Sequence, residues 1–216
     1  MSFWKKGNFV SSSIKIYDYL VNDLNCKYAW RCDKKNIFNL YQNNLKSNHL
    51  EIGPGSGYFL YPENHKKKID NLILMDINKP ILDHSYNNLK SNYSNISCFN
   101  HNIFENKINL GNINSVGINY VFHCVPGSLE DKFDKLINNI ESDNEITIFG
   151  STVISDRDKQ TYLSELELKL LNYYGIFNNN NDLSFNLINY LDSNNYLYNT
   201  SIYGNVLIFK IIKKKK

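Results

Sequence analysis

The segment that decides the fold reads His49-Leu-Glu-Ile-Gly-Pro-Gly-Ser-Gly-Tyr-Phe-Leu60. An apolar strand leads into three glycines within five residues, Gly53, Gly55 and Gly57, and a helix is expected to start at about Tyr58. Glycine permits a tight turn and lets the backbone approach a ligand without interference from a Cβ atom. The segment therefore predicts a strand, a ligand-binding turn and a helix.

The spacing of the glycines narrows the class of ligand. A dinucleotide fingerprint would require a third glycine at position 58, which is Tyr58, and the Gly-Lys-Ser/Thr ending of a phosphate loop is absent. Glu51 lies two residues before the first glycine, where a carboxylate suits a positively charged ligand such as an ammonium or a sulfonium. A plain strand–helix turn without a ligand is the alternative.

A second acid ends the next expected strand, Asn71–Asp76. In nucleoside-binding α/β folds, an acid at this place accepts hydrogen bonds from ribose hydroxyls. The alternative is that Asp76 or Asn78 caps a helix that begins near Pro80. The glycine turn upstream favours the ribose interpretation for Asp76.

The remainder of the chain alternates between strand and helix patterns, which indicates an α/β fold with a Rossmann-like, doubly wound sheet of about seven strands. The last two strands are separated only by Gly204 and predict a hairpin with an antiparallel C-terminal strand. Residues 178–182 are expected to form a loop. In the longest helix, Leu163, Leu166, Leu170 and Leu171 have the spacing of a core face. The other expected strands are His49–Ile52, Ile96–Asn100, Ser115–Phe122, Glu145–Gly150, Tyr196–Tyr203 and Asn205–Ile212, and the helices are Ser13–Leu24, Lys34–Leu45, Pro80–Leu89, Leu129–Ile140 and Asp158–Tyr173.

Composition limits the protein to one domain, because 216 residues with 42% hydrophobic content can bury a single sizeable core. Asparagine supplies 36 residues, one in six, and is expected mostly in turns and at the surface. A net charge of +3 indicates no nucleic-acid partner, and the four cysteines lack the spacing of a zinc site. The cysteine spacing leads us to expect no metal. The longest apolar run, Val206–Ile212, is too short to span a membrane, so we expect no membrane partner and a cytoplasmic location.

Over nearly its whole length, the chain resembles the class I S-adenosylmethionine-dependent methyltransferases, and more narrowly those that act on small molecules. The resemblance is carried by the glycine turn, by Asp76, by the antiparallel last strand and by the segments Tyr17-Asp18, Trp30-Arg31-Cys32, Asn119–Gly127 and Tyr174–Phe177. It implies transfer of a methyl group from S-adenosyl-L-methionine to an oxygen or nitrogen atom of a small-molecule acceptor, by direct displacement and without a metal. A methyltransferase of RNA or protein and a non-catalytic cofactor-binding module are the alternatives.

The resemblance also assigns positions to individual residues. Gly53, Gly55 and Gly57 would pass beneath the methionine part of the cofactor, Glu51 would lie near its amino-acid end, and Asp76 would hold the ribose. Where the family often has acids, this chain has Asn102, facing the adenine, and Asn114, at the start of the fourth strand. The cofactor-binding set is completed by Ile77 and Asn119.

On the reactive side, His123 follows the fourth strand and is interpreted either as a catalytic base or as a residue that packs beside the cofactor. Cys124 is expected to be a small buried hydrophobic residue. Residues 1–47 are expected to form a helical lid over an α/β core at 48–212, with a basic tail at 213–216, in a monomer or homodimer. Tyr17, Trp30 and Arg31 would close the lid, with helix packing and a surface ion pair as the alternatives.

Overall fold

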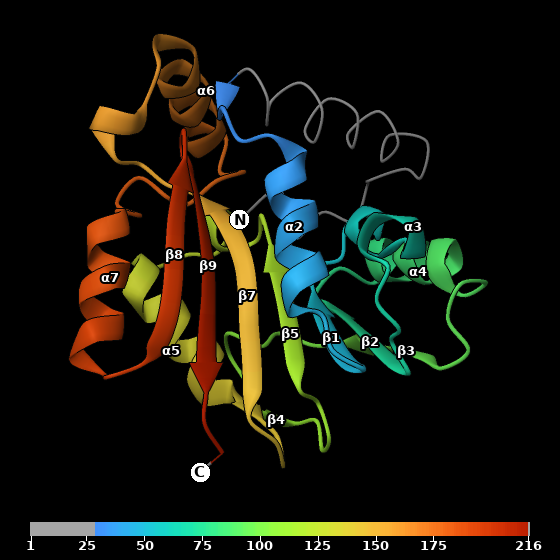
Figure 1. Ribbon diagram of the computed structural model, residues 1–216. Coiled ribbons are helices and arrows are strands. Elements are labelled where there is room, and N and C mark those ends of the chain that lie inside the picture. The colour runs from blue at the N-terminus through green and yellow to red at the C-terminus, as the bar shows by residue number, and fades with distance from the viewer. Residues whose placement is uncertain (1–28, 216) are drawn as a thin grey trace.

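The computed structural model describes residues 29–215 and is built around a seven-stranded sheet with the order β3-β2-β1-β5-β7-β9-β8 (Figure 1). Strand β9 runs antiparallel to β7 and β8, whereas the pairs among β1, β2, β3, β5 and β7 are parallel. The predicted Rossmann-like sheet with an antiparallel C-terminal strand is therefore confirmed. The strands are β1 (Asn48–Ile52), β2 (Asn71–Asp76), β3 (Ile96–Asn100), β5 (Ser115–Asn119), β7 (Ile146–Val153), β8 (Leu197–Tyr203) and β9 (Val206–Lys213).

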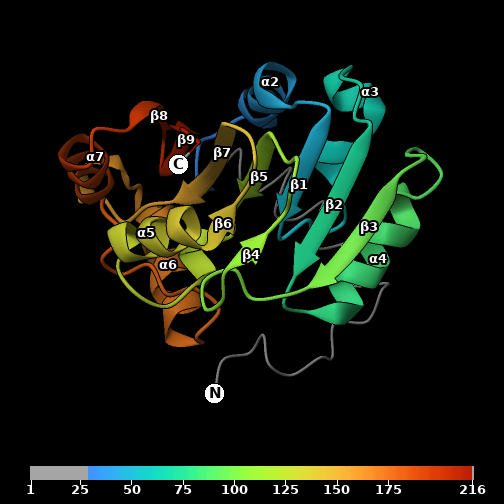
Figure 2. The same cartoon turned by 90° about the horizontal axis from the view of Figure 1, so that it is seen from below.

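Helices cover both faces of the sheet. Helix α2 lies in front of β7 and β5 in Figure 1, and α4 packs on β2 and β3 within the same apolar cluster. Helices α5 and α7 pack together on the opposite face, and Figure 2 shows them near β8, far from α4. The helices are α2 (Lys34–Asn44), α3 (Pro62–His65), α4 (Lys79–Leu89), α5 (Leu129–Asn139), α6 (Tyr162–Tyr173) and α7 (Ser184–Ser193), with two-residue strands β4 (Ile108–Asn109) and β6 (Ile140–Glu141) paired beside the sheet.

The central strands are buried on both faces, as their continuous apolar sequences predict. Side chains of β1 alternate between the two apolar clusters: Leu50 and Ile52 face α5, and His49 and Glu51 face α2. None of the helices within residues 29–215 combines the length and apolar character needed to cross a membrane.

The predicted core face of α6 is wrong for three of its four leucines. Leu163, Leu166 and Leu170 are 55%, 47% and 48% exposed, whereas Leu171 is half-buried against the apolar cluster that also contains buried Leu168. Helix α6 lies at the end of the sheet and not against a face of it (Figure 1). Helical spacing identifies residues that share one side of a helix, but it does not reveal whether another element covers that side.

Other element boundaries differ for local reasons. Strand β5 ends at Asn119 because Tyr120 adopts a left-handed backbone conformation with φ of 53°. The helix expected at Tyr58 is a single 3-10 turn, Tyr58–Leu60, followed by α3. Helix α7 was not predicted. Strand β9 continues to Lys213, whose ammonium group donates to carbonyl groups at the end of α5, so this lysine is an ordered part of the sheet.

Candidate functional site

The three glycines turn the chain directly after β1, beside the end of β5. This is where the strand order reverses, and ligands of open α/β sheets bind at this place. All three glycines have positive φ, and a Cβ on Gly53 would lie 2.4 Å from Val121 in the segment after β5. Glycine at position 53 therefore lets the turn after β1 pack closely against the segment after β5. A Cβ on Gly55 would meet nothing within 4 Å, so Gly55 borders open space.

Glu51 of β1 is 3% exposed, and both oxygens of its carboxylate have protein partners. Tyr41 of α2 donates its hydroxyl to Oε1 at 2.5 Å, and Nε2 of His49 lies 2.9 Å from Oε2. A Cβ on Gly117 would lie 2.2 Å from Oε2, so the carboxylate occupies space that β5 leaves free. Within residues 29–215, His49 is the one ion-pair partner recorded for Glu51. In the described part of the chain, this buried carboxylate has no lysine or arginine partner, which favours a ligand that brings positive charge.

Asn119, the last residue of β5, is buried and also held by protein groups. Its amide nitrogen donates to the Tyr41 hydroxyl oxygen at 2.6 Å, and its amide oxygen accepts from the Ser151 hydroxyl at 2.9 Å. Tyr41 therefore links Glu51 and Asn119 across the switch point. The predicted cofactor contacts on the two strands belong to one hydrogen-bonded network.

Asp76 lies half-buried at the end of β2, one strand away from the glycine turn. Burial raises the pKa of its carboxyl to about 6, although amide groups of Asn78 and Ile77 act in the opposite direction. Its carboxylate accepts from the amide of Asn78 at 2.7 Å, and this amide precedes α4. Asn78, the residue before the helix, makes no side-chain capping bond. Capping by the Asn78 side chain is therefore not observed, whereas Asp76 bonds the amide of the N-cap residue and no amide within α4, and it lies at the same end of the strands as the glycines.

The remaining predicted cofactor residues differ in their surroundings. Ile77 is 58% exposed directly after Asp76. The side-chain oxygen of Asn102 accepts from the amide of Phe104 at 3.1 Å, which makes a local turn after β3. Asn114 accepts from the amide of Asn48 at 3.2 Å, at the opposite edge of the sheet from the glycines. The structure thus brings Ile77 and Asn102 to the carboxyl edge and leaves Asn114 away from it.

His123 is buried in an aromatic cluster formed by Trp30, Tyr120, His123 and Phe177. The rings of His123 and Phe177 have centroids 4.1 Å apart. Burial, assisted by the charge of Lys132, lowers the pKa of His123 to about 3. Its Nδ1 faces the amide of Val153 at 3.4 Å and accepts from it, so the ring is neutral at physiological pH. These surroundings favour the packing role of His123 over that of a base.

Cys124 follows His123 and is half-buried. Burial raises the pKa of its thiol to about 12, which keeps the sulfur protonated and a poor nucleophile. Within residues 29–215, no three His, Cys, Asp or Glu side chains are grouped so that they could hold a metal ion.

Known proteins resemble this chain over most of its length. Demethylluteothin O-methyltransferase of Streptomyces thioluteus is 28% identical, covering 82% of this chain and 77% of that protein. The N-methyltransferase vrtF of Penicillium aethiopicum is 27% identical, covering 86% and 78%. The chain is a distant homologue of S-adenosylmethionine-dependent methyltransferases. No family model matches the sequence. The crystal structure of a SAM-dependent methyltransferase from Aquifex aeolicus shares the fold, with a TM-score of 0.58, 12% identity and coverage of 95% of this chain and 99% of that one.

The predicted lid residues are distributed over different places. Trp30 is 2% exposed within the aromatic cluster, and its indole N–H has no partner among the described residues. Arg31 is exposed and donates to the backbone carbonyl of Lys159, so the ion pair considered for it is not observed. It lines an open hollow of about 730 Å³ with residues 158–159, 200–202 and 204, near the β8–β9 hairpin. Strands β5, β7 and β9 separate β8 from β1, so Arg31 is not brought to the glycine turn. Tyr17 lies outside the described residues.

A structured loop between α6 and α7 was not identified from the sequence as a part of the site. Its Asp182 forms a buried ion pair with Lys132 of α5, with Nζ–Oδ2 of 2.7 Å and both side chains 1% exposed. Asn178 bonds the backbone oxygens of His123 and Cys124, and Asn179 bonds that of Val153. These bonds hold Phe177 against His123. The Asn-rich segment is therefore a loop, as predicted, but it anchors the aromatic cluster.

Proposed function

We propose that the chain transfers the methyl group of S-adenosyl-L-methionine to an oxygen or nitrogen atom of a small molecule by direct displacement. The observation that carries the proposal is the buried Glu51 carboxylate, which has no lysine or arginine partner among residues 29–215 and lies beside the open turn at Gly55. Relatives named as an O-methyltransferase and an N-methyltransferase support this class of acceptor.

The residues present fit this cofactor. Gly53, Gly55 and Gly57 form a cradle in which a side chain at Gly55 would fill open space. Each oxygen of Glu51 has a lone pair beyond the one used by its partner, so the carboxylate can still accept from an ammonium group. Asp76 offers a carboxylate to ribose hydroxyls, and Ile77 offers an exposed apolar side chain next to it.

When bound, S-adenosyl-L-methionine supplies an electrophilic methyl group on a sulfonium. The chain itself contributes orientation and the exclusion of water, which are sufficient when the transferred group is already reactive. The aromatic cluster borders the end of β5, and its half-buried member Tyr120 offers an aromatic ring to a small acceptor. His123 packs behind this ring in its neutral form.

The cofactor assignment is tested by isothermal titration calorimetry with S-adenosyl-L-methionine on the wild type, Asp76→Ala and Asp70→Ala. Asp70 is an exposed control whose carboxylate pairs with Lys68 at the surface. We expect micromolar binding by the wild type and by Asp70→Ala, and at least tenfold weaker binding by Asp76→Ala. Equal binding by all three proteins would remove Asp76 from the site.

The acceptor is sought by mass spectrometry of metabolites from cells with and without the protein. We expect at least one pair of small molecules that differ by a single methyl group. Cofactor binding without turnover to S-adenosylhomocysteine, whatever acceptor is offered, would overturn the enzymatic part of the proposal and leave a binding module.

A further inference from the structure

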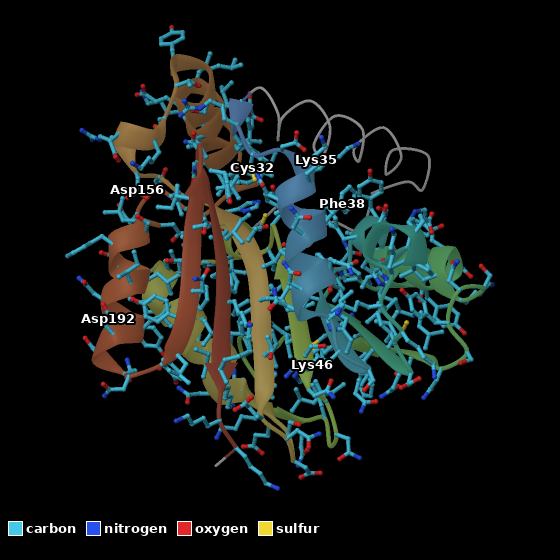
Figure 3. All side chains as sticks on the ribbon, viewed as in Figure 1. Cys32, Lys35, Phe38, Lys46, Asp156 and Asp192 are labelled. Carbon is cyan, nitrogen blue, oxygen red and sulfur yellow. The ribbon has the colours of Figure 1, made fainter. Side chains whose placement is uncertain are left out.

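A continuous line of hydrogen bonds runs beneath α2 from the amino ends of strands β1 and β5 (the amino edge) to the carboxyl end of β5 (the carboxyl edge). At the amino edge, the amide of Lys46 donates to Ser115 Oγ at 3.1 Å, and Ser115 Oγ lies 2.9 Å from His49 Nδ1. His49 continues the line to Glu51, and from there it passes through Tyr41 to the carboxyl edge. Figure 3 shows Lys46 beyond the end of α2 and Cys32 before its start, so the helix spans the distance between the two edges.

The order of donors and acceptors along this line follows from its ends. Ser115 accepts from a backbone amide, so its own proton is available to His49 Nδ1. A proton on His49 Nε2 donates to the Glu51 carboxylate at 2.9 Å, and in the tautomer that carries this proton alone the ring accepts at Nδ1. The first arm of the network therefore donates toward Glu51 at each step.

The second arm donates in the same sense from the other edge. The Ser151 hydroxyl donates to Asn119, whose amide nitrogen donates to Tyr41, whose hydroxyl donates to Glu51. Burial and the charge of Glu51 raise the pKa of Tyr41 well above its usual value, so this hydroxyl keeps its proton and remains a donor. Both arms thus end on one carboxylate, and neither contains a lysine or arginine side chain.

We propose that Tyr41 and His49 are positioning residues that hold the Glu51 carboxylate in one orientation for the ammonium group of the cofactor. The inference rests on the proposed function, because it assigns the network to the amino-acid end of S-adenosyl-L-methionine. Two further features agree with it. Gly117 leaves room for the carboxylate, and Phe149 packs against both Tyr41 and His49, which fixes the two rings.

The test compares two ligands that differ in the amino-acid part alone. S-adenosylhomocysteine carries the ammonium and carboxylate groups, whereas 5′-methylthioadenosine retains the nucleoside and the sulfur without them. Calorimetry on Tyr41→Phe, which keeps the ring and removes the hydroxyl, should show about tenfold weaker binding of S-adenosylhomocysteine, as expected for a lost bond to a charged group. Binding of 5′-methylthioadenosine should change by less than about twofold, because its contacts do not involve Glu51.

Tyr190→Phe is the matched control. It removes a tyrosine–carboxylate bond of the same kind, Tyr190 Oη to Asp134 Oδ1 at 3.0 Å, far from the network on α7. Ser115→Ala tests the first arm at its far end with a change too small to disturb packing, and it should shift the ratio of the two dissociation constants in the same direction as Tyr41→Phe. We expect Tyr190→Phe to leave both constants unchanged.

Equal weakening of both ligands in Tyr41→Phe would overturn the inference, because the network would then support the fold and not the charge. An unchanged ratio in Glu51→Gln would also overturn it, since Glu51 would not face the amino-acid part. Failure of the proposed function looks different, because the wild type would then bind neither ligand.

Discussion

Two buried carboxylates lie near the same end of the sheet and are treated in opposite ways. Asp182 receives the ammonium of Lys132, whereas Glu51 receives a tyrosine hydroxyl and an imidazole. Both side chains are almost completely removed from solvent. The chain therefore supplies a lysine ammonium group to one acid and surrounds the other with a tyrosine hydroxyl and an imidazole.

The difference corresponds to what each acid holds. Asp182 holds a loop of this chain, so its partner has to be present at all times. Burial raises the pKa of Asp182 to about 6 and lowers that of Lys132, and the attraction between the two groups counteracts both shifts. Glu51 borders the open turn, where a protein cation would occupy the place of a ligand's positive charge.

The largest effect is expected for Lys132→Met, because it leaves Asp182 buried without a counter-ion. Removal of one partner of a buried ion pair costs about 3–5 kcal/mol. Urea unfolding followed by circular dichroism measures the loss. Lys135→Met is the control, since Lys135 lies on the same helix but is exposed. The double variant Lys132→Met/Asp182→Leu should recover most of the stability, and a loss below about 1 kcal/mol in the single variant would contradict the role given to this pair.

In contrast to Lys132→Met, Glu51→Gln should weaken cofactor binding and leave the stability of the fold almost unchanged. We expect the free energy of unfolding to change by less than about 1 kcal/mol, because the amide can exchange hydrogen bonds with the Tyr41 hydroxyl and the His49 ring. Binding of S-adenosyl-L-methionine should weaken at least tenfold, which corresponds to about 1.4 kcal/mol. Unfolding and calorimetry on the same preparation give both numbers, with exposed Glu105→Gln as the control. A stability loss as large as that of Lys132→Met would remove the distinction between the two acids.

Asp76 provides an intermediate case, in which charge depends on pH. Its pKa is raised to about 6, so in the free protein the carboxylate is ionised above this pH and protonated below it. Ribose hydroxyls donate to the ionised form, so cofactor affinity should be constant above pH 7 and fall by up to about tenfold per pH unit below 6. Calorimetry between pH 5 and 8 measures the dependence. The same dependence in Asp76→Asn would assign it to another group, such as Asp182.

The smallest effect is expected at His123, which has no charge to contribute at neutral pH. His123→Gln should lower kcat less than about tenfold, and the wild-type kcat should show no inflection from this ring between pH 5 and 8. The folded-state pKa of about 3 is below the usual 6.5, so the ring stabilises the fold fully above pH 6.5 and this contribution is lost as the pH falls toward 3. A loss of kcat of a thousandfold or more in His123→Gln, with cofactor binding intact, would restore the role of base.

The sequence was sufficient for the sheet and for the edge at which the glycines lie. Continuous apolar runs and three closely spaced glycines are local signals, and the strands at Asn71–Asp76 and Ile96–Asn100 have the predicted bounds. The contact between His49 and Glu51 could also have been predicted, because the two residues are two positions apart and a strand places such residues on the same face. The contacts with Tyr41 and Asn119 could not, since Tyr41 comes from α2 and Asn119 from β5.

The loop anchors had no local signal. Lys132 lies in a helix rich in charged residues and resembles a surface lysine, and its partner Asp182 is 50 positions away. Asn179 is completely buried, yet in a chain with 36 asparagines it is indistinguishable from its exposed neighbour Asn180. Such roles depend on which segments the fold brings together, and a pattern along the chain does not encode that.

The space at Gly117 bears on how the glycine motif would behave in protein engineering. Glu51 near the end of β1 and the three glycines after the strand lie close together in the sequence, and they look like a module that could be grafted onto another α/β scaffold. A recipient with alanine at the position of Gly117 would direct a Cβ atom at the carboxylate oxygen. A functional graft therefore needs the glycine in the adjacent strand as well, and its minimal unit is a pair of strands with the helix that carries Tyr41.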